Sequence, residues 1–416
     1  MKLLIVPKPV LNKDMEVKAY YFRYKRADEM VGFQPSRAFE GSMTSPCLDV
    51  LNMVGLDAFT NGLPIFVPLN KITLLTDIEH QCKEKADNII FLLDEDTPPE
   101  EPFLGGIKRL KKLGYRFALE NISNYGKMSP VLSLSDYLLI DGNLDTRDNL
   151  LMSLSRQYPK IMFIAADVCS MTLFKQIQYG SFHLFEGSFY SVPVPKGYNS
   201  LAPVKVNSIQ LLNLVRREDF DIEDVAKIVG KDPSLSISLL RFVNSPYLGI
   251  GSKIKNIQHA VAMLGQNEVR KWTATAVSEM LASDKPDEIT KLSLMRAKFA
   301  ENLAPQFELA IHAPSLFLMG LFSILDVVLD MPIEKALEII IVSDRIADAL
   351  KYRTGDFGKV MSFIYEFESA NWSEVTRLMI LNNLDAEKIF DAYISAAQWF
   401  GSIVNFEIKD NKNNKK

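Results

Sequence analysis

The chain has 416 residues, of which 48% are hydrophobic and 24% are charged, and its formal net charge is −4. This balance is typical of a globular chain with two or three domains, and it provides no basic field for nucleic acid. We therefore expect no nucleic-acid partner. The three cysteines, Cys47, Cys82 and Cys169, lack the close spacing of a metal site or a disulfide framework, and we expect three reduced, mostly buried thiols.

No segment has the length and composition of a membrane anchor. The N-terminus carries one lysine near a short apolar run, which is too short for a secretory signal. The most apolar stretch, residues 316–325, is about half of the roughly 20 residues that cross a bilayer. We expect a cytoplasmic protein in which this stretch is a buried helix.

The first 195 residues alternate apolar runs with amphipathic stretches. The runs are nearly continuous in hydrophobicity, as in strands buried on both faces. They cover residues 3–6, 17–24, 64–69, 89–93, 115–119, 137–140, 161–165 and 182–185. Eight strands with intervening helices predict an α/β fold, a (β/α)₈ barrel that is more compact than the usual length of about 250 residues.

A proline-rich stretch, 191–203, follows the barrel and predicts an extended linker. Helical patterns come after it, with Asp221 and Asp232 as N-caps and Gly265 between two helices. The predicted organisation is a barrel over 1–195, a linker over 196–203, an all-α domain over 204–405 and a disordered tail over 406–416. The tail is predicted from its scarcity of core-forming residues.

The helical half carries a specific combination of short motifs. They are Lys231-Asp232-Pro233-Ser234-Leu235, the run LLRFVNS over 239–245, Ile257, Ala260-Val261, Leu264-Gly265 and Met295-Arg296-Ala297. This combination resembles the HDOD domain, and the resemblance extends to near Trp399. HDOD domains resemble HD phosphohydrolases that have lost their metal site.

The histidines agree with such a loss. Active HD relatives use a His-Asp doublet, whereas none of His80, His183, His259 and His312 is followed by Asp. Only His259 and His312 lie in the helical half, where we expect a surface or half-buried position on a helix for the first and a loop position for the second. Two unsupported histidines do not make a divalent metal site.

The N-terminal half resembles an EAL phosphodiesterase domain with decayed motifs. An active EAL barrel holds two metal ions with Glu, Asn and Asp side chains and has a Lys nearby. The corresponding positions here hold Tyr21, Pro68, Phe91, Glu120-Asn121, Leu139, Ala166 or Cys169, and Glu186. Tyr21, Phe91 and Leu139 are expected to fill the barrel mouth. The carboxylates that remain are Glu120, Asp141 and Glu186.

Taken together, the two resemblances imply a degenerate EAL-like barrel followed by an HDOD domain in a bacterial signalling protein. We expect a non-catalytic regulatory scaffold that acts through protein–protein interaction, without a cofactor or a metal, with a signalling protein as partner. One alternative is a cyclic di-GMP receptor that binds without hydrolysis. A third possibility is an active metal-dependent phosphohydrolase.

A loop between two predicted helices is the candidate interaction surface. It contains Pro246, Tyr247, Leu248 and Ile250 and is bounded by glycine. Loops often carry binding residues, and tyrosine is a frequent interface anchor. The alternative is that Tyr247 and Leu248 pack inward and cover the helix ends.

Overall fold

The protein is described from a computed structural model. It describes residues 3–26, 45–143, 147–193, 211–215, 220–231, 233–244, 248, 254, 256–340 and 342–413. The chain divides into two compact units, Met1–Val192 and Pro193–Lys416. The predicted linker, 196–203, lies outside the described residues, so its boundaries stay predictions.

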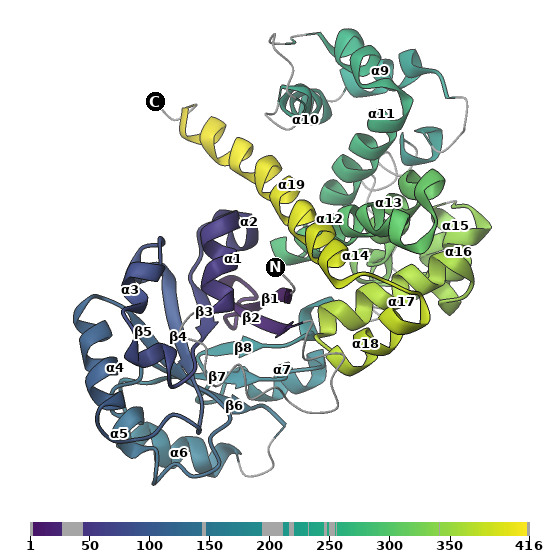
Figure 1. Ribbon diagram of the computed structural model, residues 1–416. Coiled ribbons are helices and arrows are strands. Elements are labelled where there is room, and N and C mark those ends of the chain that lie inside the picture. Colours follow the sequence, from purple (N-terminus) through teal and green to yellow (C-terminus); the bar gives the residue numbers. More distant parts are fainter. Residues whose placement is uncertain are drawn as a thin grey trace. The chain divides into compact units, whose positions relative to one another are not determined.

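The first unit is a closed eight-stranded barrel whose strands neighbour one another in sequence order (Figure 1). All eight predicted strands are present: β1 (Leu3–Leu11), β2 (Val17–Arg26), β3 (Ile65–Pro68), β4 (Ile89–Leu93), β5 (Arg116–Leu119), β6 (Tyr137–Asp141), β7 (Met162–Ala166) and β8 (Leu184–Glu186). The helices between them are α1 (Pro46–Val54), α2 (Asp57–Thr60), α3 (Ile78–Gln81), α4 (Phe103–Lys112), α5 (Ser129–Leu132), α6 (Arg147–Gln157) and α7 (Met171–Ile177).

The barrel departs from a regular (β/α)₈ barrel at its first strand. β1 runs antiparallel to both β2 and β8, whereas the other neighbours are parallel. A parallel connection needs a crossover of a dozen or more residues, and only residues 12–16 separate β1 from β2. This short connection is a turn in which the Met15 N–H donates to the carbonyl of Asn12.

The barrel interior is filled by alternate side chains from every strand. Its members are Val10, Ala19, Tyr21, Phe66, Ile90, Leu92, Ala118, Tyr137, Leu139, Ile164, Ala166 and Leu184. The predicted interior positions of Tyr21 and Leu139 are therefore confirmed. Phe91 is a correction: it lies on the opposite face of β4, with ring centroids 4.9 Å from Tyr115 and 5.8 Å from Phe117.

The second unit is helical. Its helices are α9 (Ile222–Lys231), α10 (Pro233–Val243), α11 (Ile257–Leu281), α12 (Asp287–Leu303), α13 (Ala313–Phe322), α14 (Leu325–Leu329), α15 (Ile333–Ile339), α16 (Asp344–Tyr352), α17 (Gly355–Ser369), α18 (Trp372–Leu381) and α19 (Ala386–Asn413). Gly265 interrupts α11 with φ 70° and ψ 170°, which agrees with the predicted break at this glycine. Within this unit α12 packs against α13, α17 and α19.

Two further features correct or complete the sequence predictions. Residues 406–413, predicted to be disordered, continue α19 as helix, since this stretch contains several good helix formers and neither glycine nor proline. The apolar stretch 316–325 contributes to α13, a buried helix of 10 residues. Within the described part of the chain, no helix is long and apolar enough to span a membrane.

Candidate functional site

The candidate site lies at the carboxyl ends of strands β2 to β8, where barrel enzymes place their chemistry. Alternate residues share one face of a strand, so the interior pattern continues two residues beyond each interior side chain. Two residues beyond Tyr21, Leu92 and Ala118, the same interior face therefore carries Arg23, Asp94 and Glu120. On β6 and β8 the same rule leads to Asp141 and Glu186. A polar layer therefore follows the apolar interior at this end.

Three of these side chains form a connected group. The Tyr21 hydroxyl donates to Oε2 of Glu120 at 2.6 Å. Nη1 of Arg23 lies 3.8 Å from the same oxygen, and the guanidinium lies over the Tyr21 ring, 4.3 Å from its centroid. Glu120 thus accepts a hydrogen bond from the phenol and faces a guanidinium charge, while Tyr21 covers one face of the arginine.

The electrostatics of the group follow from burial and mutual charge. Burial raises the pKa of Glu120, and the charges of Asp94 and Glu186 act in the same direction, whereas Tyr21 and Arg23 oppose them. Burial also raises the pKa of Tyr21 well above its ordinary value. For Arg23, burial disfavours the charged form, yet the surrounding oxygen atoms together raise its pKa. The arginine is therefore a fixed cation among carboxylates.

Two further carboxylates of this layer, Glu186 and Asp141, accept hydrogen bonds from loop residues. Glu186 is 3% exposed and accepts the backbone N–H of Asp167 at 3.1 Å. Asp141 is exposed. Its carboxylate accepts hydrogen bonds from the backbone N–H of Asn143, at 2.8 Å, and from the side-chain amide of Asn143, at 3.0 Å. Asp141 thus bonds to its own loop, not to the Tyr21–Arg23–Glu120 group.

These residues do not fit the two divalent metal ions of an active EAL barrel. Such ions need several ionised oxygen ligands that converge. Here Glu120 is bonded to Tyr21 and faces Arg23, and the next layer inward is formed by Tyr21, Leu92 and Leu139. Among the residues that the structure describes, no group of three His, Cys, Asp or Glu side chains is placed to hold a metal ion.

Some site residues were placed well by sequence reasoning and others were missed. Leu92, not Phe91, is the interior residue of β4, because a shift of one residue along a strand changes the face. Cys169 is exposed, which corrects the expectation of mostly buried thiols. Arg23 and Asp94 were not singled out, although counting two residues on from Tyr21 and Leu92 finds both.

In the helical half, Asn244 of the LLRFVNS motif bridges the two ends of a loop. Its amide nitrogen donates to the carbonyls of Leu240, at 2.6 Å, and Ile254, at 2.8 Å, and its oxygen accepts the Ile254 N–H at 2.8 Å. The predicted interaction loop lies between these ends. Its residues Pro246, Tyr247 and Ile250 lie outside the described residues, and Leu248 is partly buried.

The two histidines of this half lie apart from one another. His259 is exposed on α11, as predicted for a helix-surface residue. His312 lies at the end of a 3₁₀ turn, Ala310–His312, where its Nε2 is 2.8 Å from Nη1 of Arg345 and its ring packs edge-on against Phe357. An arginine neighbour makes His312 a poor ligand for a cation.

Replacing Asn244 by alanine removes three hydrogen bonds that close the loop. We expect the free energy of unfolding of the helical unit to fall by about 1–3 kcal/mol. The measurement is urea unfolding followed by tryptophan fluorescence, since Trp272, Trp372 and Trp399 all belong to this unit. Asn382→Ala is the matched control: its amide makes one bond, to Leu378 within the same helix end, and we expect a smaller loss. Equal losses in both variants would contradict the bridging role.

The fold and site define a class of protein: an eight-stranded barrel whose mouth holds an internal arginine–carboxylate group, joined to a helical domain. The comparisons with known proteins agree. The HDOD domain family model matches residues 201–343, so the helical half contains an HDOD domain, as predicted. The predicted order, an eight-stranded barrel followed by a helical domain that the HDOD model matches, is confirmed.

Two curated proteins are similar over most of their length. An uncharacterised Bacillus subtilis protein, YuxH, is 27% identical over 97% of this chain and 100% of its own. The cyclic di-GMP phosphodiesterase CdgJ of Vibrio cholerae is 28% identical over 75% of this chain and 73% of its own. The chain is thus related to proteins of cyclic di-GMP signalling.

Solved structures are similar over the barrel half. The PaMucR phosphodiesterase in complex with c-di-GMP has 12% identity and a TM-score of 0.38, covering 45% of this chain and 94% of that chain. The EAL-like domain protein YdiV has 15% identity and a TM-score of 0.37, covering 44% of this chain and 89% of that chain.

Proposed function

We propose that this protein is a non-catalytic regulatory scaffold of cyclic di-GMP signalling, which acts by binding another protein. The observation that carries the proposal is the group at the barrel mouth. Arg23 lies against the Tyr21 ring and close to Glu120. Its guanidinium therefore supplies the positive charge beside this carboxylate, which in a metal site would be a ligand of the metal ion.

Hydrolysis of a phosphodiester by a metal pair requires ionised ligands and an activated water. Burial raises the pKa of Glu120, which works against the ionised form, and the Tyr21 hydroxyl already bonds one of its oxygens. The interior residues below, Leu92 and Leu139, have no donor atom for a metal ion. The mouth is therefore better suited to a structural role than to catalysis.

A second candidate is a cyclic di-GMP receptor that binds without hydrolysis. It is favoured by the pairing of Arg23 with Tyr21, because an arginine and an aromatic ring can hold a dinucleotide without a metal. The Vibrio cholerae relative named as a cyclic di-GMP phosphodiesterase supports the same ligand class. Against it, Arg23 already faces Glu120.

The purified full chain is expected not to hydrolyse cyclic di-GMP with either Mg²⁺ or Mn²⁺, because the mouth does not assemble a metal pair. The measurement is chromatography of the nucleotide products over a range of protein concentrations. Turnover that rises in proportion to the protein and is lost in Glu120→Gln would overturn the proposal.

Titration calorimetry separates the scaffold from the receptor. The scaffold predicts no saturable heat with cyclic di-GMP, with or without Mg²⁺. Saturable binding that weakens in Arg23→Gln, without turnover, would favour the receptor. Lys25→Gln, two residues along the same strand, is the control for a general loss of positive charge.

A further inference from the structure

A cavity lies at the opposite end of the barrel from the candidate site. It has a volume of about 700 Å³ and is lined by residues at the amino ends of the parallel strands, among them Ala19, Arg116 and Leu184. Ala19 and Arg23 are four residues apart on β2, a separation of about 13 Å at ~3.3 Å per residue. The cavity is therefore distinct from the Tyr21–Arg23–Glu120 group.

The inner wall of the cavity is the lower layer of the barrel interior. Ala19, Phe66, Ile90, Tyr137 and Leu184 belong both to the interior cluster and to the cavity lining. Ala19 has the smallest side chain of the five, which leaves room beside the rings of Phe66 and Tyr137. These rings meet edge to face, with centroids 5.4 Å apart. The inner wall is thus mainly apolar and contains two aromatic rings.

The rim of the cavity is cationic. Its sixteen lining residues, all within the described part of the chain, include Lys13, Lys18 and Arg116 and contain no Asp or Glu. Most ligand pockets are apolar with a few placed polar groups. Here the charged groups have a single sign, so charge complementarity favours an anion.

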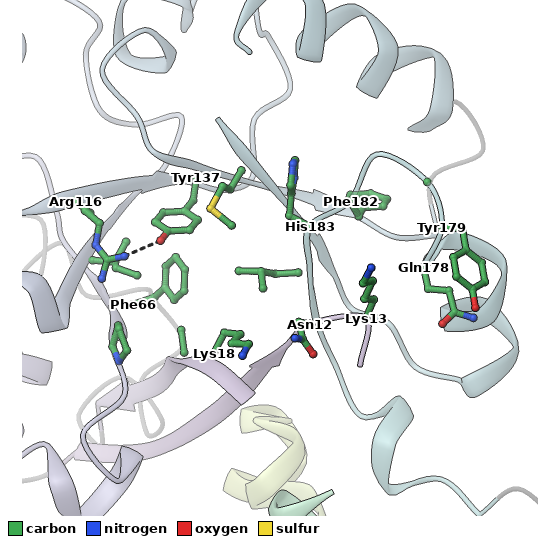
Figure 2. A pocket seen from close by; sticks show the side chains of 16 residues that line it. Asn12, Lys13, Lys18, Phe66, Arg116, Tyr137, Gln178, Tyr179, Phe182 and His183 are labelled. Carbon is green, nitrogen blue, oxygen red and sulfur yellow. Dashed lines mark hydrogen bonds between the residues drawn. The ribbon is translucent and has the colours of Figure 1, made fainter. Parts of the chain in front are cut away.

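Arg116 is held in place at this rim. Nη1 donates to the Tyr137 hydroxyl at 2.7 Å (Figure 2), and Nη2 donates to the carbonyl of Asp87 at 2.6 Å. These two bonds fix the plane of the guanidinium beside the aromatic wall. Lys18 pairs with Glu16 at 2.6 Å, but both side chains are about half exposed or more, so this surface pair contributes little and an incoming anion can displace it.

We propose that this end of the barrel binds a small amphipathic anion, whose apolar ring system lies against Phe66 and Tyr137 and whose carboxylate or phosphate lies at Arg116 and Lys18. The cavity volume is within the range of small-molecule sites, about 300–1,000 Å³. Arginine suits either head group because its planar fork matches both. This site is separate from the Tyr21–Arg23–Glu120 group, and the proposal does not rest on the proposed function.

The test is calorimetric titration of the full chain with three probes that share a naphthalene ring: 2-naphthoate, 2-naphthyl phosphate and uncharged 2-naphthol. We expect at least one anion to bind about tenfold or more tightly than 2-naphthol, the scale of one charged hydrogen bond. The tighter of the two anions assigns the head group as carboxylate or phosphate.

Two substitutions test the location from different sides. Arg116→Gln removes one of the three positive charges at the rim and should weaken the anion about tenfold while leaving 2-naphthol within about twofold. Ala19→Leu fills the inner wall and should weaken all three probes. Arg156→Gln, an exposed arginine on α6 outside this cavity, is the matched control and should change nothing. If Arg116→Gln fails to fold, Lys18→Gln takes its place, because Lys18 is exposed.

Three results would overturn the proposal. One is the absence of saturable binding by either anion up to about 1 mM, the weak limit of a specific site. Another is equal affinity for 2-naphthol and the anions, which would remove the role of the rim charge. The third is anion binding that survives both Arg116→Gln and Ala19→Leu, which would locate it elsewhere.

Discussion

Glu368→Ala is expected to lower the free energy of unfolding of the helical unit by about 3–5 kcal/mol, the usual cost of removing one partner from a buried ion pair. Arg296 is 8% exposed. Its Nε donates to both Glu368 oxygens, at 3.0 and 2.9 Å, and its Nη2 lies 2.8 Å from Oε2. Without Glu368 the guanidinium keeps its charge but loses its counter-ion.

The surroundings of Arg296 offer only partial compensation. Nη1 donates to the Ser323 hydroxyl at 3.1 Å, and the guanidinium lies over the Tyr365 ring, 4.7 Å from its centroid. Both partners are neutral at pH 7, since burial raises the pKa of Tyr365 above its ordinary value. The charge of Arg296 also acts on Asp326, where it opposes the burial that raises the pKa of that carboxyl. A second acidic group therefore stays nearby, and we expect a loss at the lower end of the range, about 3 kcal/mol.

The measurement is urea unfolding of the full chain, followed by the fluorescence of the three tryptophans, all of which lie in the helical unit. Glu374→Ala is the matched control. Glu374 pairs with Arg377 one turn along α18, and this arginine is 57% exposed, so the loss should be below about 1 kcal/mol. Similar losses of unfolding free energy in the two variants would show that the buried Arg296–Glu368 pair stabilises the unit no more than an exposed pair does.

Arg296 and Asn244 give a physical meaning to two motif positions of the helical half. Arg296 joins α12 to α17, and Asn244 bridges the ends of a loop. Both contacts stabilise the fold and neither contains a reactive group. These two motif positions therefore report on the packing of the domain.

Local sequence patterns predicted the elements of the fold well, but they did not predict contacts between side chains far apart in the sequence. All eight barrel strands followed from apolar runs, because burial on both faces gives a strong signal over a few residues. The pair of Arg296 with Glu368 spans 72 residues, and no local pattern contains such a contact. The assignment of Phe91 to the interior was wrong because a shift of one residue reverses the face of a strand.

In the candidate site, too, some features follow from residue types and others depend on contacts between distant segments. The interior positions of Tyr21 and Leu139 could be predicted from residue types. The contact between Arg23 and Glu120 depends on the closure of the barrel, which brings β2 and the end of β5 together across its interior. The cavity at the other end depends on side-chain sizes in one interior layer, and composition gives no sign of it.

The helical unit should become more stable as the pH rises from about 7.5 to 9.5, because it buries Lys291. This side chain on α12 is 7% exposed, and burial lowers its pKa to about 8, while the charge of Glu288, 3.8 Å away, opposes the shift. In the unfolded chain its pKa is about 10.4. Between these two values the unfolded state binds more protons, so the free energy of unfolding increases with pH.

The expected gain is about 2 kcal/mol between pH 7.5 and 9.5, as follows from a folded pKa of about 8. The pH range ends at 9.5 because buried Tyr365 and Tyr393 have raised pKa values, so their ionisation on unfolding opposes stability above about pH 10.

Lys291→Met should remove this gain in stability, whereas Lys227→Met, at an exposed lysine on α9, should keep it. The measurement is urea unfolding by tryptophan fluorescence at each pH. A Lys291→Met profile parallel to that of the unmodified chain would mean that Lys291 stays charged in the folded state throughout this range, and that its burial is compensated by its neighbours.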